Sequence, residues 1–417
     1  MTSDKKNNMT VPTHNLYDFI NNTLENQFLI YAFSPWGAKE LENLKCINWP
    51  AVDDNLLLGN IRPPDFINNI VPNKKYRSYH NEFYPVCVCN DQEPLNFDFY
   101  RNDSLDADKN LRNILPFSYQ KQWVLLHSEI NSREVDKYRN TNLFKTAYWW
   151  SHAIIARDWY RFAEHDTRLL DNCYKKVFLV YARGTTGSRY YRTQFLKSIK
   201  KSTNLASNCQ IGSFVGQKPT GDFSAFYDRY DFQSTQISLV LETIFDNRIH
   251  LTEKTLRPIA CGHPFILAAG PGSLELLKKY GFKTFHPYIN ENYDRVADSN
   301  LRMQKIINEM ERICNLDYCD QQFIFSKIRD IASFNKKLFF SKNFAHAVTE
   351  ELKQNVKMAY DQTDGYDYKI IQKDIKESTN IGNNEHKKYR QQCYKKFADH
   401  LEKGGTLDNY VPPEIDF

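Results

Sequence analysis

Short apolar runs alternate with helix-forming segments between residues 176 and 280, and this alternation limits the possible folds more than any other feature of the chain. The apolar runs have the length and the β-branched or aromatic content of buried strands, and the segments between them have helical composition. The strand-like runs are residues 176–181, 237–245 and 264–268, and the helix-forming segments are residues 194–201, 253–261 and 273–280. This order predicts βαβ units and a mainly parallel sheet.

The preceding half of the chain carries the same signals at wider spacing. Its apolar runs end in turn-forming residues, and a long aromatic stretch follows the last of them. The strand candidates are residues 28–33, 84–88 and 122–127, and the helix candidates are residues 38–42 and 147–164. The expected fold class is therefore α/β in both halves.

A change in composition near residue 172 marks the expected boundary between the two α/β halves. Residues 295–360 are helical by pattern, and the sequence after residue 361 is polar and weakly patterned. The expected organisation is a polar tail at residues 1–13, an N-terminal domain at residues 14–171, a second domain at residues 172–300 and a helical region with a polar tail at residues 301–417.

Composition narrows the classes of function. The chain has 417 residues, of which 41% are hydrophobic, enough for two packed cores. Its formal net charge is only +5, whereas a dedicated nucleic-acid binder usually has a stronger basic excess or a clear basic stripe. The basic run at residues 197–201 is interpreted as the solvated face of a helix.

Membrane and metal-binding signals are weak in this sequence. No stretch approaches the about 20 apolar residues that span a bilayer, and residues 1–13 lack the apolar core of a secretion signal. The nine cysteines do not form the paired Cys-x-x-Cys pattern of a structural zinc site. We therefore expect reduced cysteines, a cytoplasmic protein and no bound metal.

The segment at residues 250–266 holds the most informative motif. Thr252 is placed to cap a helix that starts at Glu253, so Glu253 and Lys254 lie in the first turn beside free backbone N–H groups. A helix that starts at a strand end binds anions readily. Lys254 would contact a pyrophosphate and Glu253 a ribose hydroxyl, while Gly262 ends the helix. An ordinary capped helix with a surface Glu-Lys pair is the alternative interpretation.

A second candidate anion site follows the strand-like run at residues 176–181. Gly184 and Gly187 allow a tight turn, and Arg183, Arg189 and Arg192 offer planar donors suited to phosphate. The turn is not a P-loop, because it lacks the Gly-Lys-Ser/Thr ending. A polar turn with solvated arginines is the alternative. Taken together, two such sites at the ends of parallel strands favour a nucleotide diphosphate ligand.

Carboxylates in the first half are candidates for a general base. Asp91 and Glu93 follow a strand candidate, and a carboxylate there would face a cleft, although the same residues also fit a simple turn. Asp106 and Asp108 match the Asp-x-Asp pattern of metal-dependent glycosyltransferases but follow no apolar strand, so we interpret them as a surface loop.

Polar residues also occur within the aromatic stretch at residues 147–164. Arg157 and Asp158 are expected to form a structural ion pair, with the lining of a cleft as the alternative, and His152 is expected to be a core histidine rather than a catalyst.

The motifs together resemble a group of bacteriophage- and virus-encoded glycosyltransferases. The resemblance runs from about residue 80 to 302 and lies in residues 91–95, 155–159, 183–192, 239–243, 251–258, 262–265 and 281–285. The Thr252-Glu253-Lys254 core is also similar to that of the α-1,3-fucosyltransferases, in which the Glu and Lys, with an upstream Arg, bind the ribose and diphosphate of the donor. The resemblance assigns these roles to Glu253, Lys254 and either Arg183 or Arg189.

The resemblance implies a GT-B-like protein with two Rossmann-like domains that face a cleft, and with additional C-terminal helices. It implies a metal-independent enzyme that transfers a sugar from a nucleotide-sugar to a saccharide or modified-nucleobase hydroxyl, with the donor as co-substrate and no other cofactor. By analogy it favours Glu93 as the base, and Asp91 is the other candidate. The competing hypothesis is a non-catalytic nucleic-acid-binding or structural viral protein, which would need a continuous basic face.

Overall fold

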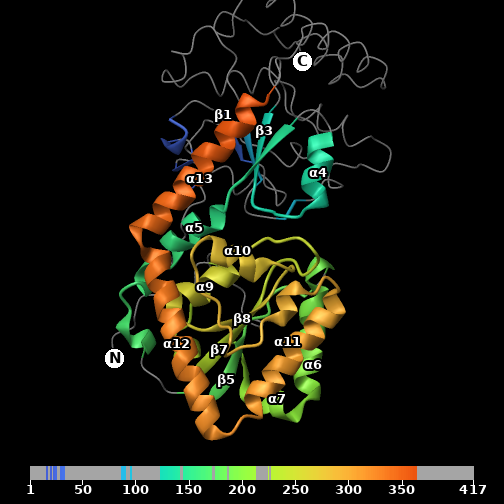
Figure 1. The fold of residues 1–417 in the computed structure, drawn as a ribbon, viewed down its shortest axis with the longest axis vertical. Coiled ribbons are helices and arrows are strands. Elements are labelled where there is room, and N and C mark those ends of the chain that lie inside the picture. The colour runs from blue at the N-terminus through green and yellow to red at the C-terminus, as the bar shows by residue number, and fades with distance from the viewer. Residues whose placement is uncertain are drawn as a thin grey trace, which may run out of the picture. The chain divides into compact units, whose positions relative to one another are not determined.

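The computed structural model is shown in Figure 1. It describes residues 16, 19–20, 22–25, 29–32, 86–90, 94–95, 123–140, 144–170, 174–185, 187–212, 224 and 227–363. This part of the chain contains two four-stranded sheets, and all neighbouring strands in them pair in parallel. The expected α/β class is confirmed.

The chain divides into two compact units. The first unit holds the described residues of Pro12–His127 together with Arg133–Tyr148 and those of Leu352–Phe417. The second unit holds Ser128–Ser132 and the described residues of Trp149–Glu351. The division thus falls before the aromatic segment at 149–170, whereas the sequence places a boundary near residue 172. The physical reason is that α5 (Ser151–Trp159) packs on α9 (Glu253–Cys261) of the second unit.

The first unit is built on a parallel sheet in the order β1-β2-β3-β4. Its elements are β1 (Leu29–Ala32), β2 (Val86–Asn90), β3 (Trp123–His127), α4 (Arg133–Asn140) and β4 (Phe144–Tyr148). The three expected strands are confirmed, and β4 is additional. Cys87, Cys89 and Leu126 are fully buried within the sheet, because strands of a parallel sheet are normally covered on both faces.

The second unit contains the sheet that bears the main sequence motifs. Its strands are β5 (Lys176–Val180), β6 (Cys209–Ile211), β7 (Thr235–Leu241) and β8 (Phe265–Ala268), in the order β6-β5-β7-β8. In the register, Phe178 pairs with Ile237, and Leu239 pairs with Ile266. Every residue of β7 is buried, which places this strand at the centre of the core.

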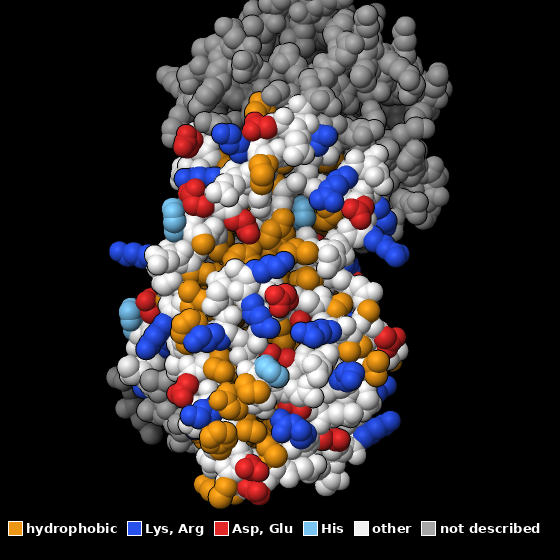
Figure 2. Space-filling model, viewed as in Figure 1, with side chains coloured by type: hydrophobic (Ala, Val, Ile, Leu, Met, Phe, Trp, Pro, Cys, Tyr) orange, Lys and Arg blue, Asp and Glu red, His pale blue; other side chains and the backbone are white. Residues whose placement is uncertain are grey.

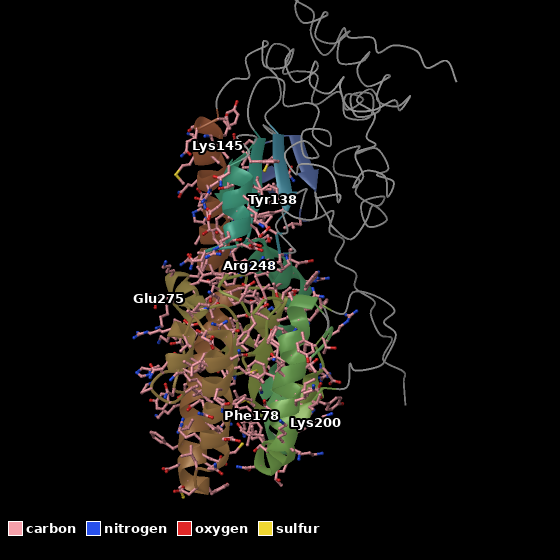
Figure 3. The ribbon with its side chains drawn as sticks, turned by 90° about the vertical axis from the view of Figure 1, so that its right-hand side faces the viewer. Tyr138, Lys145, Phe178, Lys200, Arg248 and Glu275 are labelled. Atoms are coloured by element: carbon pink, nitrogen blue, oxygen red, sulfur yellow. The ribbon has the colours of Figure 1, made fainter. Side chains whose placement is uncertain are left out.

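Helices cover both faces of this second sheet. The helices of this unit are α5, α6 (Tyr190–Lys201), α7 (Thr203–Asn208), α8 (Arg229–Gln233), α9, α10 (Ser273–Lys279), α11 (Ser299–Cys314), α12 (Tyr318–Phe340) and, as far as Glu351, α13 (Lys342–Asp361). Helices α6, α7 and α11 pack together on one face, and α9 packs with α12 on the other (Figure 1). Figure 3 shows Phe178 inside these layers and Lys200 at the outer surface of α6.

The expected helical region after residue 295 is confirmed as α11, α12 and α13. Within the second unit, the Trp149 indole Nε1 donates to the Val348 carbonyl of α13 at 2.9 Å. Within the first unit, the Asn355 side-chain amide, from the last part of α13, donates to the Tyr148 carbonyl at 2.7 Å. In the described part of the chain, no helix is long and apolar enough to cross a bilayer.

Two expected elements differ from the structure. The long helix expected at residues 147–164 is replaced by the end of β4, by α5 and by a short 3₁₀ helix at Arg161–Ala163. The strand expected at residues 237–245 starts earlier and ends at Leu241. It ends there because the side chain of the next residue, Glu242, bonds to the start of α9.

Candidate functional site

The strand order of the second sheet defines where a ligand would bind. The connection from β5 leads to β6 on one side, and the connection from β6 leads past β5 to β7 on the other. Neighbouring parallel strands whose connections leave in opposite directions open a crevice at their carboxyl ends, and α/β proteins bind ligands there. In this chain that point lies between Tyr181, which follows β5, and Glu242, which follows β7.

The buried carboxylate of Glu242 organises the β7 side of this crevice. It accepts hydrogen bonds from the backbone N–H groups of Thr243, Thr252 and Thr255 at 3.0, 2.9 and 3.3 Å. It also accepts the hydroxyl protons of Thr252 and Thr255 at 2.7 and 2.6 Å. These five hydrogen bonds fix the N-terminus of α9 at the end of β7. They also provide the partners that a buried carboxylate needs.

The first turn of α9 has the expected form. The Thr252 hydroxyl accepts from the Lys254 backbone N–H at 3.4 Å, and Gly262 ends the helix in the left-handed region at φ 68°. The Lys254 ammonium lies 2.7 Å from a Glu253 carboxylate oxygen, 3.1 Å from the Thr243 hydroxyl and 3.3 Å from that of Thr252. An incoming anion would therefore share Lys254 with Glu253.

The charge state of Glu253 follows from its neighbours. Burial by itself raises the pKa of this carboxyl, but the neighbouring Lys254, His152 and Arg257 lower it, and the net pKa lies well below its usual range. Glu253 is therefore ionised at neutral pH. An ionised carboxylate accepts hydrogen bonds from hydroxyl groups, which is the chemistry expected of a ribose contact.

The segment between β5 and α6, residues 181–189, borders the same crevice, and we call it the arginine loop. Gly184 adopts φ 63°, and a Cβ there would lie 3.4 Å from Cδ of Arg189. Arg183 is exposed and Arg189 is half-buried. Arg192 is buried and donates to the main-chain carbonyls of Arg183, Gly184 and Glu242, the last at 2.6 Å. Arg192 thus joins the two strand-end loops, which favours a positioning role over direct phosphate contact. Ligand contacts by Arg183 and Arg189 stay predictions.

Sequence reasoning missed a further cation, Arg257, one turn along α9. Its Nε donates to the Tyr160 hydroxyl at 3.2 Å, and its Nη2 donates to the Ser224 carbonyl at 3.1 Å. The guanidinium also lies over the rings of Tyr160 and Tyr181, at 5.9 and 5.6 Å from their centroids. Burial lowers the pKa of Arg257, but Tyr160 and Glu253 raise it above its ordinary value, so the group stays charged.

Lys254 and Arg257 line a small cavity at the carboxyl ends of β5 and β7. Its volume is about 30 Å³, enough for one water molecule. The other lining residues are Leu179, Tyr181, Phe232, Ser238, Leu239, Val240, Leu241 and Pro258. The cavity therefore combines two cationic groups with an aromatic and aliphatic wall.

The segment Ser128–Ser132 lies beside the residues that precede α9. Ile130 and Ile249 form an antiparallel bridge with hydrogen bonds of 2.9 and 3.0 Å. The Ser128 hydroxyl lies 3.0 Å from Nδ1 of His250, and the His152 ring packs edge-on against His250 at 5.3 Å. Both rings are buried, so His152 occupies the core as expected. Burial and the neighbouring His152 lower the pKa of His250 to about 3, which keeps it neutral.

The expected ion pair between Arg157 and Asp158 is wrong in its partners. Arg157 donates to the main-chain carbonyls of Phe339 and Phe340, the second at 3.1 Å. Asp158 instead pairs with Arg161 at 3.1 Å. Adjacent residues of a helix point in different directions, so Arg157 and Asp158 do not face each other.

The carboxylates expected in the first half, Asp91, Glu93, Asp106 and Asp108, lie outside the described residues. Within the part of the chain that the structure describes, no cluster of three or more His, Cys, Asp or Glu side chains is arranged to hold a metal ion. Scans against protein-family models, curated proteins and solved structures found no match to this chain. Any assignment of function therefore depends on the residues of the site.

Proposed function

We propose that this protein is a glycosyltransferase of the GT-B type, which transfers a sugar from a nucleotide-sugar to a saccharide or modified-nucleobase hydroxyl. The observation that carries the proposal is the convergence of Lys254, the N-terminus of α9 and the arginine loop at the β5–β7 crevice. Cations and helix N-termini at this point of a parallel sheet suit a diphosphate. The presence of a parallel α/β sheet in each unit also supports the proposal.

The proposed reaction exchanges one bond at the anomeric carbon of the donor. The acceptor hydroxyl oxygen forms a bond to that carbon, while the bond from the carbon to the diphosphate oxygen breaks. The bonding electron pair leaves on the diphosphate, where Lys254 stabilises the developing negative charge. In this proposal Glu253 holds the ribose, and cationic side chains take the role that a metal plays in other enzymes.

The proposal also needs a base for the acceptor hydroxyl. The hydroxyl proton passes to a carboxylate of the first half of the chain, for which Glu93 and Asp91 are the candidates. Glu93→Gln and Asp91→Asn should separate the two. The variant that lacks the base should lose transfer to the acceptor while it retains the affinity for the donor.

Variants of the α9 turn test the donor site. We expect Lys254→Ala and Glu253→Ala to reduce donor hydrolysis and transfer by about 100-fold or more, because each removes a charged contact. UDP-, GDP-, CMP- and dTDP-sugars would be screened with the wild type first, by thermal shift and by product release. Lys278→Met on α10 is the matched control, since the Lys278 side chain is 48% exposed and its ammonium lies 3.6 Å from Glu275. Full activity in both α9 variants would refute the site.

The competing function, a nucleic-acid-binding or structural viral protein, makes a different prediction. It requires salt-sensitive binding to plain duplex DNA and no thermal shift with any nucleotide diphosphate. On the face shown in Figure 2, basic side chains are interspersed with acidic and neutral ones, which favours the enzyme. Filter binding to modified and plain duplexes would also identify a transferase that acts on modified DNA bases.

A further inference from the structure

The setting of Arg257 differs from that of an arginine with a purely structural role. Among the described residues, no carboxylate lies within ion-pair distance of its guanidinium, which bonds instead to a hydroxyl and a carbonyl. Against the effect of burial, Tyr160 and Glu253 raise the pKa of the guanidinium, which stays charged, and the two tyrosine rings add cation–π contacts. By comparison, Arg248, nearby in the same unit, pairs with both Glu129 and Asp246.

The nearby carboxylates do not neutralise Arg257 directly. Glu253 is 2.7 Å from the Lys254 ammonium and forms its ion pair there. The oxygens of Glu242 are occupied by the backbone and hydroxyl donors of the threonines around the start of α9. The cavity lined by Lys254 and Arg257 therefore has two cationic side chains and no carboxylate among its lining residues.

The guanidinium is held in one orientation by groups from three elements. The Tyr160 hydroxyl accepts from its Nε and itself donates to the Ser224 carbonyl at 2.5 Å. Tyr181 follows the carboxyl end of β5. Its ring is fixed by a hydrogen bond of 2.7 Å from its hydroxyl to Asp231. Of the five N–H donors of an arginine, the bonds to Tyr160 and Ser224 use two. The rest of the planar fork remains for a ligand.

We propose that Arg257 is a second ligand-binding cation of the crevice and that, with Lys254, it binds the diphosphate of the donor. This inference rests on the proposed function and deepens it, because it assigns the diphosphate to two cations of α9. Arg257 supplies a planar fork suited to phosphate oxygens, and Lys254 supplies a point charge. Tyr160 and Tyr181 are positioning residues that present the guanidinium.

Binding of inorganic pyrophosphate, measured by titration calorimetry on the full chain, tests this assignment without any sugar transfer. We expect Arg257→Met to raise the dissociation constant about 10-fold or more, since it removes charge-assisted hydrogen bonds. Arg257→Lys, which keeps the charge but not the fork, should fall between Arg257→Met and the wild type. Tyr160→Phe keeps the ring and removes the bond to Nε, so a smaller loss is expected. Lys278→Met should bind as the wild type does.

Chemical protection gives a second readout on the unmodified sequence. Pyrophosphate should slow the modification of Arg257 by phenylglyoxal, measured by mass spectrometry of peptides, and should leave Arg139 unchanged, whose side chain is 55% exposed in the first unit. Equal pyrophosphate affinity in Arg257→Met and the wild type, or modification of Arg257 that pyrophosphate does not slow, would overturn the inference and leave the proposed function standing. A wild type that binds neither pyrophosphate nor any nucleoside diphosphate would instead overturn the proposed function.

Discussion

Single residues hold the crevice together through contacts that span long stretches of sequence. Glu242 bonds to Thr252 and Thr255 through its side chain, and its main-chain carbonyl accepts from Arg192. The hydroxyl of Tyr191 donates to the same carbonyl. One residue thus links α6, β7 and α9, and each of these links lies at the proposed donor site.

Gly212 is a residue whose small size the site requires. A Cβ at this position would lie 2.1 Å from Cε1 and 2.3 Å from Cδ1 of Tyr181. We expect Gly212→Ala to displace the Tyr181 ring, to lower the free energy of unfolding by about 1–3 kcal/mol and to weaken pyrophosphate binding through Arg257. Urea unfolding and calorimetry would measure the two effects.

A double-mutant cycle identifies the cause of that loss. In a Tyr181→Ala background the ring is absent, so Gly212→Ala should cost much less stability than in the wild type. The same cost in both backgrounds would contradict the proposed clash with Tyr181.

The sequence reveals local roles of residues better than distant ones. The caps at Thr252 and Gly262 were predictable, because a cap depends on residues within one turn of the helix. The role of Arg257 depends on Tyr160, which lies 97 residues away in the sequence. Arg192 lies in an arginine-rich motif that predicts phosphate binding. Its hydrogen bond to the Glu242 carbonyl, 50 residues away in the sequence, is seen only in the structure.

At the scale of elements, strands with continuous apolar runs were predictable, and short or mixed strands were not. β5 and β8 lie within one residue of their expected ranges, because they are buried on both faces. β6 has only three residues, and β4 reads Phe-Lys-Thr-Ala-Tyr, so neither gives a clear apolar signal. Their pairing depends on neighbouring strands rather than on local propensity.

The start of α9 is the element on which the proposed donor site depends most. The Thr252 hydroxyl both caps the helix and donates to Glu242 at 2.7 Å. We expect Thr252→Ala to lower the free energy of unfolding by about 1–2 kcal/mol, and to weaken pyrophosphate binding because Lys254 loses a neighbour at 3.3 Å. Thr252→Ser keeps the hydroxyl and should resemble the wild type in urea unfolding. Equal losses in the two variants would show that the methyl group, not the hydroxyl, matters.

At the scale of the whole molecule, the alternating pattern predicts parallel sheets but not the order of their strands. The order β6-β5-β7-β8 places the crevice between β5 and β7, and this order requires β6, which the sequence does not reveal. The division of the chain is also a property of packing. Ser128–Ser132 belongs to the second unit through the pairing of Ile130 with Ile249, a contact between residues far apart in sequence.

Buried ionisable groups determine how the stability of the whole chain depends on pH. Burial lowers the pKa of His263 to about 4 and, with His152, that of His250 to about 3, from an ordinary value of 6.5. The unfolded state therefore binds protons first as the pH falls, so both histidines remove stability between about pH 6.5 and 4. Asp294 acts in the opposite direction. Its pKa is raised by burial to about 6, so the folded state gains stability when this carboxyl is protonated.

Burial also raises the pKa of Asp231, Glu291 and Glu351, which act in the same direction as Asp294. A variant therefore isolates the loss of stability that His263 contributes between about pH 7.5 and about pH 5. In the folded state Nδ1 of His263 lies 2.9 Å from the Ser238 hydroxyl, and Nε2 lies 2.9 Å from the Thr235 carbonyl. A neutral ring satisfies both contacts when Nε2 carries the proton. His263→Gln keeps a donor for the Thr235 carbonyl but does not titrate, so its loss of stability over this pH range should be smaller by about 1–2 kcal/mol. Urea unfolding at both pH values measures the difference. An unchanged pH dependence in the variant would mean that His263 takes up its proton without unfolding the core around it.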